Sequence, residues 1–320
     1  MTTKINELKT ALFAHKEVLI CSHIRPDGDT IGATLALREV LLTKGILVDI
    51  VCDSSIPQKF SYLSEVKEYK RVEEITKQYP LVVFVDTASD GQMGECYKIF
   101  YSHKNVINID HHVSNKGYAK YNYVVNKASC CEVLADMFKE MGIEITQNIA
   151  KFLLLGMVTD TGNFAHNNTT ANTLKVASEM VEKGANLVEI NLQMFKNQPM
   201  SRSKLYLEIM SKSQYFHEDR VAVIIIRQQD LQKYGLDNSV TEGFIDYNLT
   251  ISSVVISVSI LETKDKTYKV SFRSKGEIDV NRVAGTFGGG GHKNASGAML
   301  RGYLEDVVDK LVFTCGQYLD

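Results

Sequence analysis

The sequence predicts an α/β protein with two domains. We expect a doubly wound and mostly parallel sheet, joined by a helical connector to a smaller mixed α/β domain. Short apolar runs alternate with helical patterns in the first half of the chain, which is typical of a parallel sheet covered by helices. Three of those runs end directly at acidic or imidazole side chains. The pattern changes near residue 214, where the second domain is expected to begin.

The secondary structure of the first half follows from hydrophobic periodicity. Apolar residues at helical spacing indicate amphipathic helices, and continuous apolar runs of strand length indicate buried strands. The expected helices cover residues 4–15, 30–44, 72–78, 132–141, 145–158 and 174–181, and the expected strands cover 18–22, 46–52, 81–85 and 106–109.

The second half is organised differently. Residues 186–213 are expected to form two helices joined at Pro199, as a connector. After it we expect an apolar strand at 221–226, a hairpin of strands 254–261 and 268–274, and a closing helix at 307–313. The predicted domains are therefore 1–185, 186–213 and 214–320.

Length, composition and charge limit the function classes. A chain of 320 residues exceeds one ordinary core, and 44% hydrophobic with 23% charged residues is typical of a globular protein. The formal net charge of -2 argues against a basic track for long DNA or RNA, whereas a short anionic ligand is compatible with it. Six scattered cysteines without a CxxC pair favour a reducing compartment. No signal peptide or membrane-span run is apparent, so we expect a cytoplasmic protein without membrane contact.

Acidic and imidazole side chains follow three of the predicted strands, and one more carboxylate follows a predicted helix. The carboxyl ends of parallel strands meet at one crevice, so these groups should lie together. Four carboxylates at one place would repel one another unless cations neutralise them, and two divalent ions would do so. The candidate metal ligands are His23, Asp27, Asp29, Asp86, His111 and Asp160.

The mixed donor set of these residues suits Mn²⁺, with Mg²⁺, Co²⁺ or Zn²⁺ as alternatives. Two such ions about 3.5–4 Å apart polarise a phosphoryl oxygen and activate a water, so the expected reaction is phosphoester hydrolysis. Taken singly, Asp29 before a helix is more often only an N-cap, and Asp86 at a strand end is more often only a turn residue. The full set at successive strand ends favours the metal site.

A glycine run in the second half is a candidate phosphate cradle. Four successive glycines, 288–291, allow backbone N–H groups to approach an anion closely. The run lacks the Gly-Lys-Ser/Thr ending of a Walker A loop, and alone it is as often a flexible loop. Cationic and imidazole side chains near it favour the cradle, whereas Lys275, Arg282 and Lys293 are as readily solvated surface charges. The candidate substrate-binding residues are Arg273, Gly289, Gly290, Gly291 and His292.

These motifs resemble those of the DHH phosphoesterase superfamily, in the family's order and over nearly the whole chain. The metal motifs are His23-x-x-x-Asp27-x-Asp29, a strand ending in Asp86, the triplet Asp110-His111-His112, and Thr159-Asp160-Thr161-Gly162. The run Gly288–His292, followed by Ala295-Ser296-Gly297, resembles the DHH-associated domain. The length resembles the compact nanoRNase/pAp phosphatase (NrnA-like) type.

The resemblance implies a role for each candidate metal ligand. Two divalent ions, by resemblance manganese, would share one bridging carboxylate and activate a hydroxide that attacks phosphorus. His23 and Asp27 would bind the first ion, Asp29, His111 and Asp160 the second, and Asp86 both.

The resemblance also implies the remaining roles at the site. His112 would face the scissile phosphate as an electrostatic stabiliser or general acid. Asp110 would orient the metal-bound ring of His111, and with Asp86 and His112 it completes the expected catalytic set. Arg273 would clamp a terminal phosphate of the substrate, and His292 would reach the same or the neighbouring phosphate. Because the ions and the clamp lie in different domains, their separation would favour substrates with a phosphate close to the cleaved bond.

The activity implied by the resemblance is hydrolysis of short oligoribonucleotides and of adenosine 3′,5′-bisphosphate (pAp). The alternatives are a phosphodiesterase for cyclic-di-AMP or linear pApA, a manganese pyrophosphatase, and a non-catalytic nucleotide-binding module. The partners expected are short RNA or nucleotides, without a long-DNA track. The sequence leaves the quaternary state open, and the resemblance favours a homodimer through the first domain.

Overall fold

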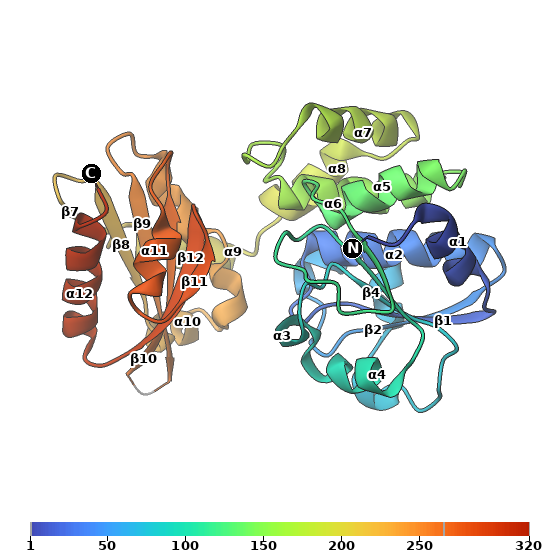
Figure 1. The fold of residues 1–320 in the computed structure, drawn as a ribbon. Helices are drawn as coiled ribbons and strands as arrows, with labels where there is room; N and C mark the ends of the chain where they lie inside the picture. The colour runs from blue at the N-terminus through green and yellow to red at the C-terminus, as the bar shows by residue number, and fades with distance from the viewer. Residues whose placement is uncertain (1, 265, 320) are drawn as a thin grey trace. The chain divides into compact units, whose positions relative to one another are not determined.

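The computed structural model describes residues 2–264 and 266–319, and the chain divides into two compact units, Met1–Asn197 and Gln198–Asp320 (Figure 1). The division falls inside the segment 186–213. Helix α8 (Leu187–Asn191), continued by a π-helix, precedes it, and helix α9 (Met200–Met210) follows with Pro199 as its N-cap. The two helices predicted around Pro199 are therefore confirmed.

The first unit contains a six-stranded parallel sheet in the order β3-β2-β1-β4-β5-β6. The predicted doubly wound parallel sheet is confirmed. Its strands are β1 (Glu17–Cys21), β2 (Leu47–Val51), β3 (Tyr69–Lys70), β4 (Val82–Val85), β5 (Val106–Asp110) and β6 (Tyr121–Val124). Its helices before α8 are α1 (Ile5–Phe13), α2 (Gly28–Thr43), α3 (Asp90–Met93), α4 (Tyr97–Ser102), α5 (Cys130–Glu140), α6 (Gln147–Asp160) and α7 (Ala171–Glu182).

Both faces of this sheet are buried, which is why its central strands are continuous apolar runs. On β1, Val18 and Ile20 belong to the core that includes α1, α2, α5 and α6, whereas Leu19 and Cys21 belong to a smaller core on the other face. Figure 1 shows α3 and α4 on that second side. The helices therefore leave the carboxyl-terminal edge of the sheet to the loops.

The second unit contains a mixed six-stranded sheet in the order β11-β12-β10-β9-β8-β7. Only the β8–β9 pair is parallel. One face packs under α11 and α12, and the other packs against α9 and α10. The strands are β7 (Gln214–Phe216), β8 (Val221–Ile226), β9 (Ile256–Lys264), β10 (Thr267–Ser274), β11 (Gly290–His292) and β12 (Ala295–Arg301); the helices are α10 (Gln228–Lys233), α11 (Val280–Gly285) and α12 (Leu304–Gly316).

Several elements differ from the sequence predictions. The helix predicted over 72–78 is wrong: only a 3₁₀ turn forms, Val72–Glu74. The hairpin strands run further toward each other than predicted, and position 265 of the predicted turn lies outside the described residues. Strands β3 and β6 were not predicted, because they are short edge strands that lack an apolar run. Within the described residues, no helix combines the length and apolar character needed to span a bilayer.

Candidate metal centre

The acidic and imidazole residues lie where the strand order of the first sheet reverses. Strand β1 is followed on one side by β2 and on the other by β4. Such a reversal opens a crevice at the carboxyl ends of the strands. His23 follows β1, Asp86 follows β4 directly, and Asp110 is the last residue of β5.

Three groups of side chains at this edge have the geometry of metal sites, and two of them contain the six predicted ligands; the third joins Asp86 to Asp110, His111 and His112. The first group is His23, Asp27 and Asp86, and the second group is Asp29, His111 and Asp160; in each, one potential ligand atom per residue lies within 4.8 Å of the others. Asp86 also connects the groups, because its Oδ2 lies 3.4 Å from Nε2 of His23 and its Oδ1 lies 3.4 Å from Nε2 of His111. His111 Nε2 is also 3.4 Å from Asp160 Oδ2. The structure therefore brings all six predicted ligands together.

The first turn of α2 positions the two aspartates of the first motif. Asp27 is its N-cap and accepts hydrogen bonds from the backbone N–H groups of Asp29 and Thr30, both at 3.0 Å. The capping role that the sequence suggested for Asp29 therefore belongs to Asp27. Asp29 is fully buried and instead accepts from the backbone N–H groups of Cys130, at 2.6 Å, and Cys131, at 2.9 Å, at the start of α5.

Asp29 and Asp160 come together because α2 and α6 pack unusually closely. A Cβ on Gly156 of α6 would collide with the carboxylate of Asp29 on α2 and would lie 2.8 Å from Cβ of Cys131 on α5. A Cβ on Gly32 of α2 would collide with the Phe152 carbonyl oxygen on α6. Glycine at these two positions is thus required for the second group to form.

The backbone and carboxylate of Asp86 carry the signs of a ligand-binding residue. Its φ of 54° is left-handed, which is costly for a non-glycine residue and tends to occur at functional sites. Its Oδ2 accepts a hydrogen bond from the Thr30 hydroxyl at 2.7 Å. Its Oδ1 is buried and has no hydrogen-bond partner in the described part of the chain. Its nearest charged neighbour is Nε2 of His111, at 3.4 Å. Because a buried carboxylate oxygen is costly to leave without a hydrogen bond, this atom fits a bound cation.

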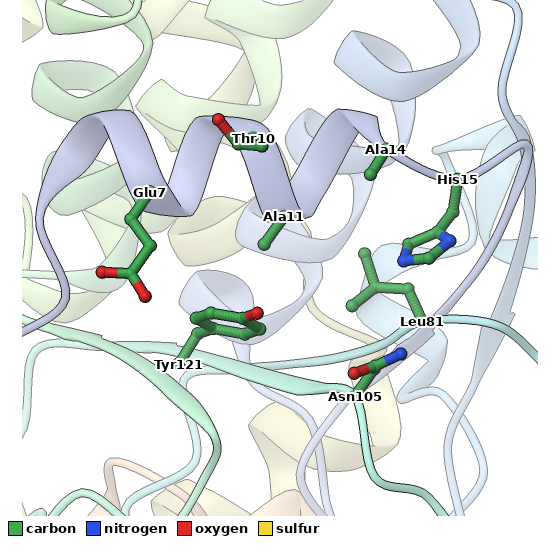
Figure 2. A pocket seen from close by; sticks show the side chains of 8 residues that line it. All are labelled: Glu7, Thr10, Ala11, Ala14, His15, Leu81, Asn105 and Tyr121. Carbon is green, nitrogen blue, oxygen red and sulfur yellow. The ribbon is translucent and has the colours of Figure 1, made fainter.

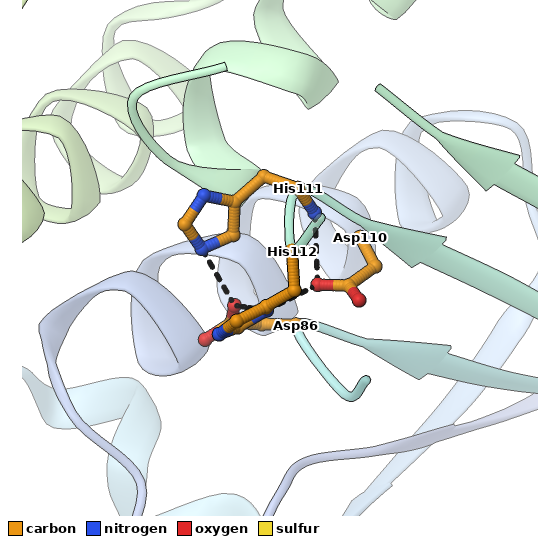
Figure 3. A group of neighbouring side chains, drawn as sticks. All are labelled: Asp86, Asp110, His111 and His112. Atoms are coloured by element: carbon orange, nitrogen blue, oxygen red, sulfur yellow. Dashed lines mark hydrogen bonds and ion pairs between the residues drawn. The ribbon is translucent and has the colours of Figure 1, made fainter. Parts of the chain in front are cut away.

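The contacts of Asp110 correct one prediction (Figure 3). Its Oδ1 accepts from the backbone N–H of His111 at 2.8 Å and lies 2.7 Å from Nδ1 of His112. The ring of His111 is instead oriented by its Nδ1, which lies 3.2 Å from the carbonyl oxygen of Lys127. Asp110 therefore orients the ring of His112, and the prediction that it orients the ring of His111 is wrong.

Sequence reasoning missed two polar residues that support the site. Asn115 donates to Oδ2 of Asp110 at 2.6 Å, so both carboxylate oxygens of that fully buried residue are occupied. Thr30 links Asp86 to the first turn of α2. Each lies within five residues of a recognised motif, and this proximity is the only sequence signal that could have found them.

The charged groups shift one another's pKa values. Burial raises the pKa of Asp29 to about 7, and the charge of Asp86 adds to this. Burial lowers the pKa of His23, but Asp86 and Asp27 outweigh it and raise that pKa to about 9. The pKa of His111 likewise rises against burial, to about 11. Burial raises the pKa of Asp86, yet the two imidazoles outweigh it and hold it below its usual range. In the metal-free cluster the imidazoles of His23 and His111 therefore hold their protons. Divalent cations could replace this positive charge as those protons are released.

In the second unit, the two predicted phosphate-binding side chains lie in one row of the sheet. Arg273 of β10 and His292 of β11 are each directly opposite Ala295 of β12. Side chains at such positions point to the same face, so the small Ala295 leaves space between the guanidinium and the imidazole. The next row on the same face also carries only small residues, which are Ser271, Gly297 and Gly290.

The glycine run is not a loop with free donors. The backbone N–H groups of Gly288, Gly289 and Gly291 donate to Gly285 O, Ala284 O and Asn281 Oδ1, at 3.1, 2.9 and 2.8 Å. The expectation that the N–H groups of the run face an anion is therefore wrong for these three glycines. Two of the glycines have positive φ, 71° at Gly288 and 153° at Gly291. The run instead allows a tight turn into β11, and charge at this face must come from side chains.

One cavity of about 350 Å³ lies away from the candidate site (Figure 2). It is lined by α1 and by Leu81, Asn105 and Tyr121, which stand at the amino ends of β4, β5 and β6. Ligands of open α/β sheets bind at the carboxyl ends, so this cavity lies at the opposite edge from the metal centre.

Each of the two units matches a known domain family, and the chain is similar to several known proteins along most of its length. Residues 17–157 match the DHH family, N-terminal domain, and residues 218–319 match the DHHA1 domain. The bifunctional oligoribonuclease and PAP phosphatase NrnA of Thermus thermophilus is 31% identical, over 89% of this chain and 84% of that protein. The protein of the same name from Bacillus subtilis is 28% identical, over 96% of each chain.

Two further relatives widen the comparison. The cyclic-di-AMP phosphodiesterase GdpP of Bacillus subtilis is 23% identical, and the match covers 98% of this chain and 49% of GdpP. The crystal structure of an exopolyphosphatase-related protein from Bacteroides fragilis has a TM-score of 0.92 at 24% identity, covering 98% of this chain and 96% of that one. At this identity the structural match supports the fold alone.

Proposed function

Because the chain belongs to the DHH family and is a hydrolase of phosphoric esters, we propose that it cleaves short oligoribonucleotides and pAp with two bound manganese ions. The observation that carries the proposal is the position of Asp86, which belongs to the first group, lies 3.4 Å from His111 of the second, and has a buried Oδ1 without a hydrogen bond. The relatives named NrnA support the substrate class.

The six clustered residues fit the two ions that the family implies. His23 and Asp27 would hold one ion, Asp29, His111 and Asp160 the other, and Asp86 both. Bound in this way, two divalent ions supply a Lewis acid for the phosphoryl oxygen and lower the pKa of a water. Oxygen and imidazole donors favour manganese among the candidate metals.

His112 is the residue that would act on the scissile phosphate. Its Nδ1 faces Asp110, which is fixed in turn by Asn115. With Nδ1 committed to that carboxylate, its Nε2 is left for the substrate. Burial lowers the pKa of His112, but the hydrogen bond and charge of Asp110 outweigh it and raise it, so the imidazolium is favoured. A proton held at Nε2 would stabilise the developing charge or protonate the leaving oxygen.

The second unit would bind another phosphate of the same substrate. Arg273 is partly exposed, and its Nε lies 3.8 Å from Asp246 Oδ1, a weak pairing that an anion could displace. His292 shares its face of the sheet, with only small side chains between them. A guanidinium and an imidazole on one open face suit a terminal phosphate, as in pAp or the end of a short oligonucleotide.

The proposal is tested by incubating the metal-stripped protein, with and without Mn²⁺, with pAp, a ribonucleotide dimer, cyclic-di-AMP and pyrophosphate. We expect metal-dependent phosphate release from pAp and cleavage of the dimer. Cleavage of cyclic-di-AMP alone would favour the activity in the name of GdpP. Cleavage of pyrophosphate alone would replace the proposal, and no turnover of any substrate would favour a nucleotide-binding module.

A further inference from the structure

The segment 127–131, which leads into the first turn of α5, is connected to every member of the second group. The carbonyl oxygen of Lys127 lies 3.2 Å from Nδ1 of His111. The N–H groups of Cys130 and Cys131 donate to the two carboxylate oxygens of Asp29, at 2.6 and 2.9 Å. The turn 127–131 therefore orients two of the three side chains directly.

The third member of the group is tied to the same turn through one side chain. Nδ2 of Asn168 donates to the carbonyl oxygen of Ala128 at 3.0 Å and to that of Asp160 at 3.1 Å. Asn168 thus joins the turn to the end of α6, where Asp160 lies. The first group has its own anchors at the start of α2, where Asp27 is the N-cap and the Thr30 hydroxyl bonds Asp86.

The turn is itself held by a fully buried carboxylate, that of Glu132. Its Oε2 accepts from the backbone N–H of Ala128 at 3.2 Å and from the hydroxyl of Thr173 at 2.8 Å. Its Oε1 accepts from Nδ2 of Asn172 at 2.7 Å and lies 3.6 Å from the ammonium group of Lys127. A buried charge with this many partners fixes its surroundings strongly.

We propose that Glu132 is a positioning residue for the second metal ion, which it does not touch. It fixes the turn 127–131, and the turn sets the positions of Asp29 and His111 and, through Asn168, that of Asp160. This inference rests on the proposed assignment of those three residues as ligands. Residues that orient metal ligands from behind typically affect metal affinity by about 10–100-fold.

The substitution Glu132→Gln isolates this role, because it preserves shape but places an amide NH₂ where an oxygen accepted from two donors. At least one pair of donors, Ala128 N–H with Thr173 or Asn172 with Lys127, then loses its acceptor. We expect the affinity of the second Mn²⁺ to fall by about 10–100-fold, while that of the first changes by less than about threefold. The matched control is Asp136→Asn on the same helix, since Asp136 pairs with the Lys127 side chain, at 2.9 Å, and not with the turn backbone.

The measurement is a titration of the metal-stripped protein with Mn²⁺, followed by calorimetry and by the electron paramagnetic resonance of free Mn²⁺. The wild type should bind two ions, and failure to do so would contradict the proposed function itself. If the wild type binds two ions and Glu132→Gln binds both with unchanged constants, the inference is overturned. An equal loss at both sites, with a lower melting temperature, would show a merely structural role and would also overturn it.

A second variant covers the case in which Glu132→Gln does not fold. Asn168 is exposed, so Asn168→Ala should leave the core intact while it removes the link between Ala128 and Asp160. We again expect selective weakening of the second ion. Unchanged binding of both ions in Asn168→Ala would contradict the role of the turn.

Discussion

Substitution of Gly156 by alanine should damage both stability and the second group of ligands. The new Cβ would lie 2.8 Å from Cβ of Cys131 and nearer still to Cys131 Sγ and Asp29 Oδ1, whereas ordinary contact begins at 3.4 Å. Either α6 must move away from Cys131 of α5 by more than half an ångström, or Cys131 and Asp29 must shift and strain the bond between them. Overpacking of this kind costs about 1–3 kcal/mol. For a unit of this size, that lowers the melting temperature by roughly 2–12 °C.

The assay for Gly156→Ala is thermal unfolding with and without Mn²⁺, together with turnover of pAp. Displacement of a ligand by about 1 Å should reduce activity by on the order of 100-fold. Gly91→Ala is the matched control, because a Cβ there meets no atom nearer than 3.9 Å, and it should melt within about 1 °C of the wild type. Wild-type stability and activity in Gly156→Ala would refute the argument that α6 needs this close contact with α2 and α5.

Three further predictions follow from the site. Asp86→Ala should leave a folded chain but lower Mn²⁺-dependent turnover by more than about 100-fold, and retained turnover would contradict the shared-ligand assignment. Arg273→Ala should raise KM for pAp by about 10-fold or more without changing Mn²⁺ binding, whereas an unchanged KM would exclude the clamp. The raised pKa values of Asp29 (to about 7) and His23 (to about 9) stabilise the metal-free fold at low pH and cease to do so as pH rises. The melting temperature of the metal-free protein, kept in a chelator, should therefore decrease as the pH is raised from about 5 to about 9, while Mn²⁺ affinity increases. A melting temperature that increases over this range would contradict the prediction.

The fold was predictable where burial leaves a strong periodic pattern. Strands β1, β4 and β5 are buried on both faces, so their sequences are continuous apolar runs that end at polar side chains. Strands β3 and β6 lie at the sheet edges, where one side is unpaired and burial is partial, and no such run marks them. The helix expected over 72–78 was wrong because a short amphipathic stretch can also form a 3₁₀ turn, and periodicity over so few residues does not separate the two.

The six clustered residues were identifiable by sequence because residue type and position at the end of a strand or helix are local properties. Their supports were not identifiable, since hydrogen bonds between distant segments leave no trace in spacing. Asp29 accepts from Cys130 and Cys131, which are about a hundred positions away, and Asp110 proved to orient His112 rather than the ring of His111. The glycine run shows the same limit, because nothing in the sequence reveals that the N–H groups of Gly288, Gly289 and Gly291 are paired within the fold.

The sequence by itself determined which side chains carry charge and coordinating atoms, and which strands and helices they follow. Because parallel strands bring their carboxyl ends to one edge of the sheet, it also determined that these side chains would lie near one another. Only the tertiary structure decided which of them share Asp86 and which turn holds the second group. Those relations depend on the close packing of α2 against α6 and on the buried carboxylate of Glu132. Both arise from contacts between segments far apart in the chain, and they form only when the core closes.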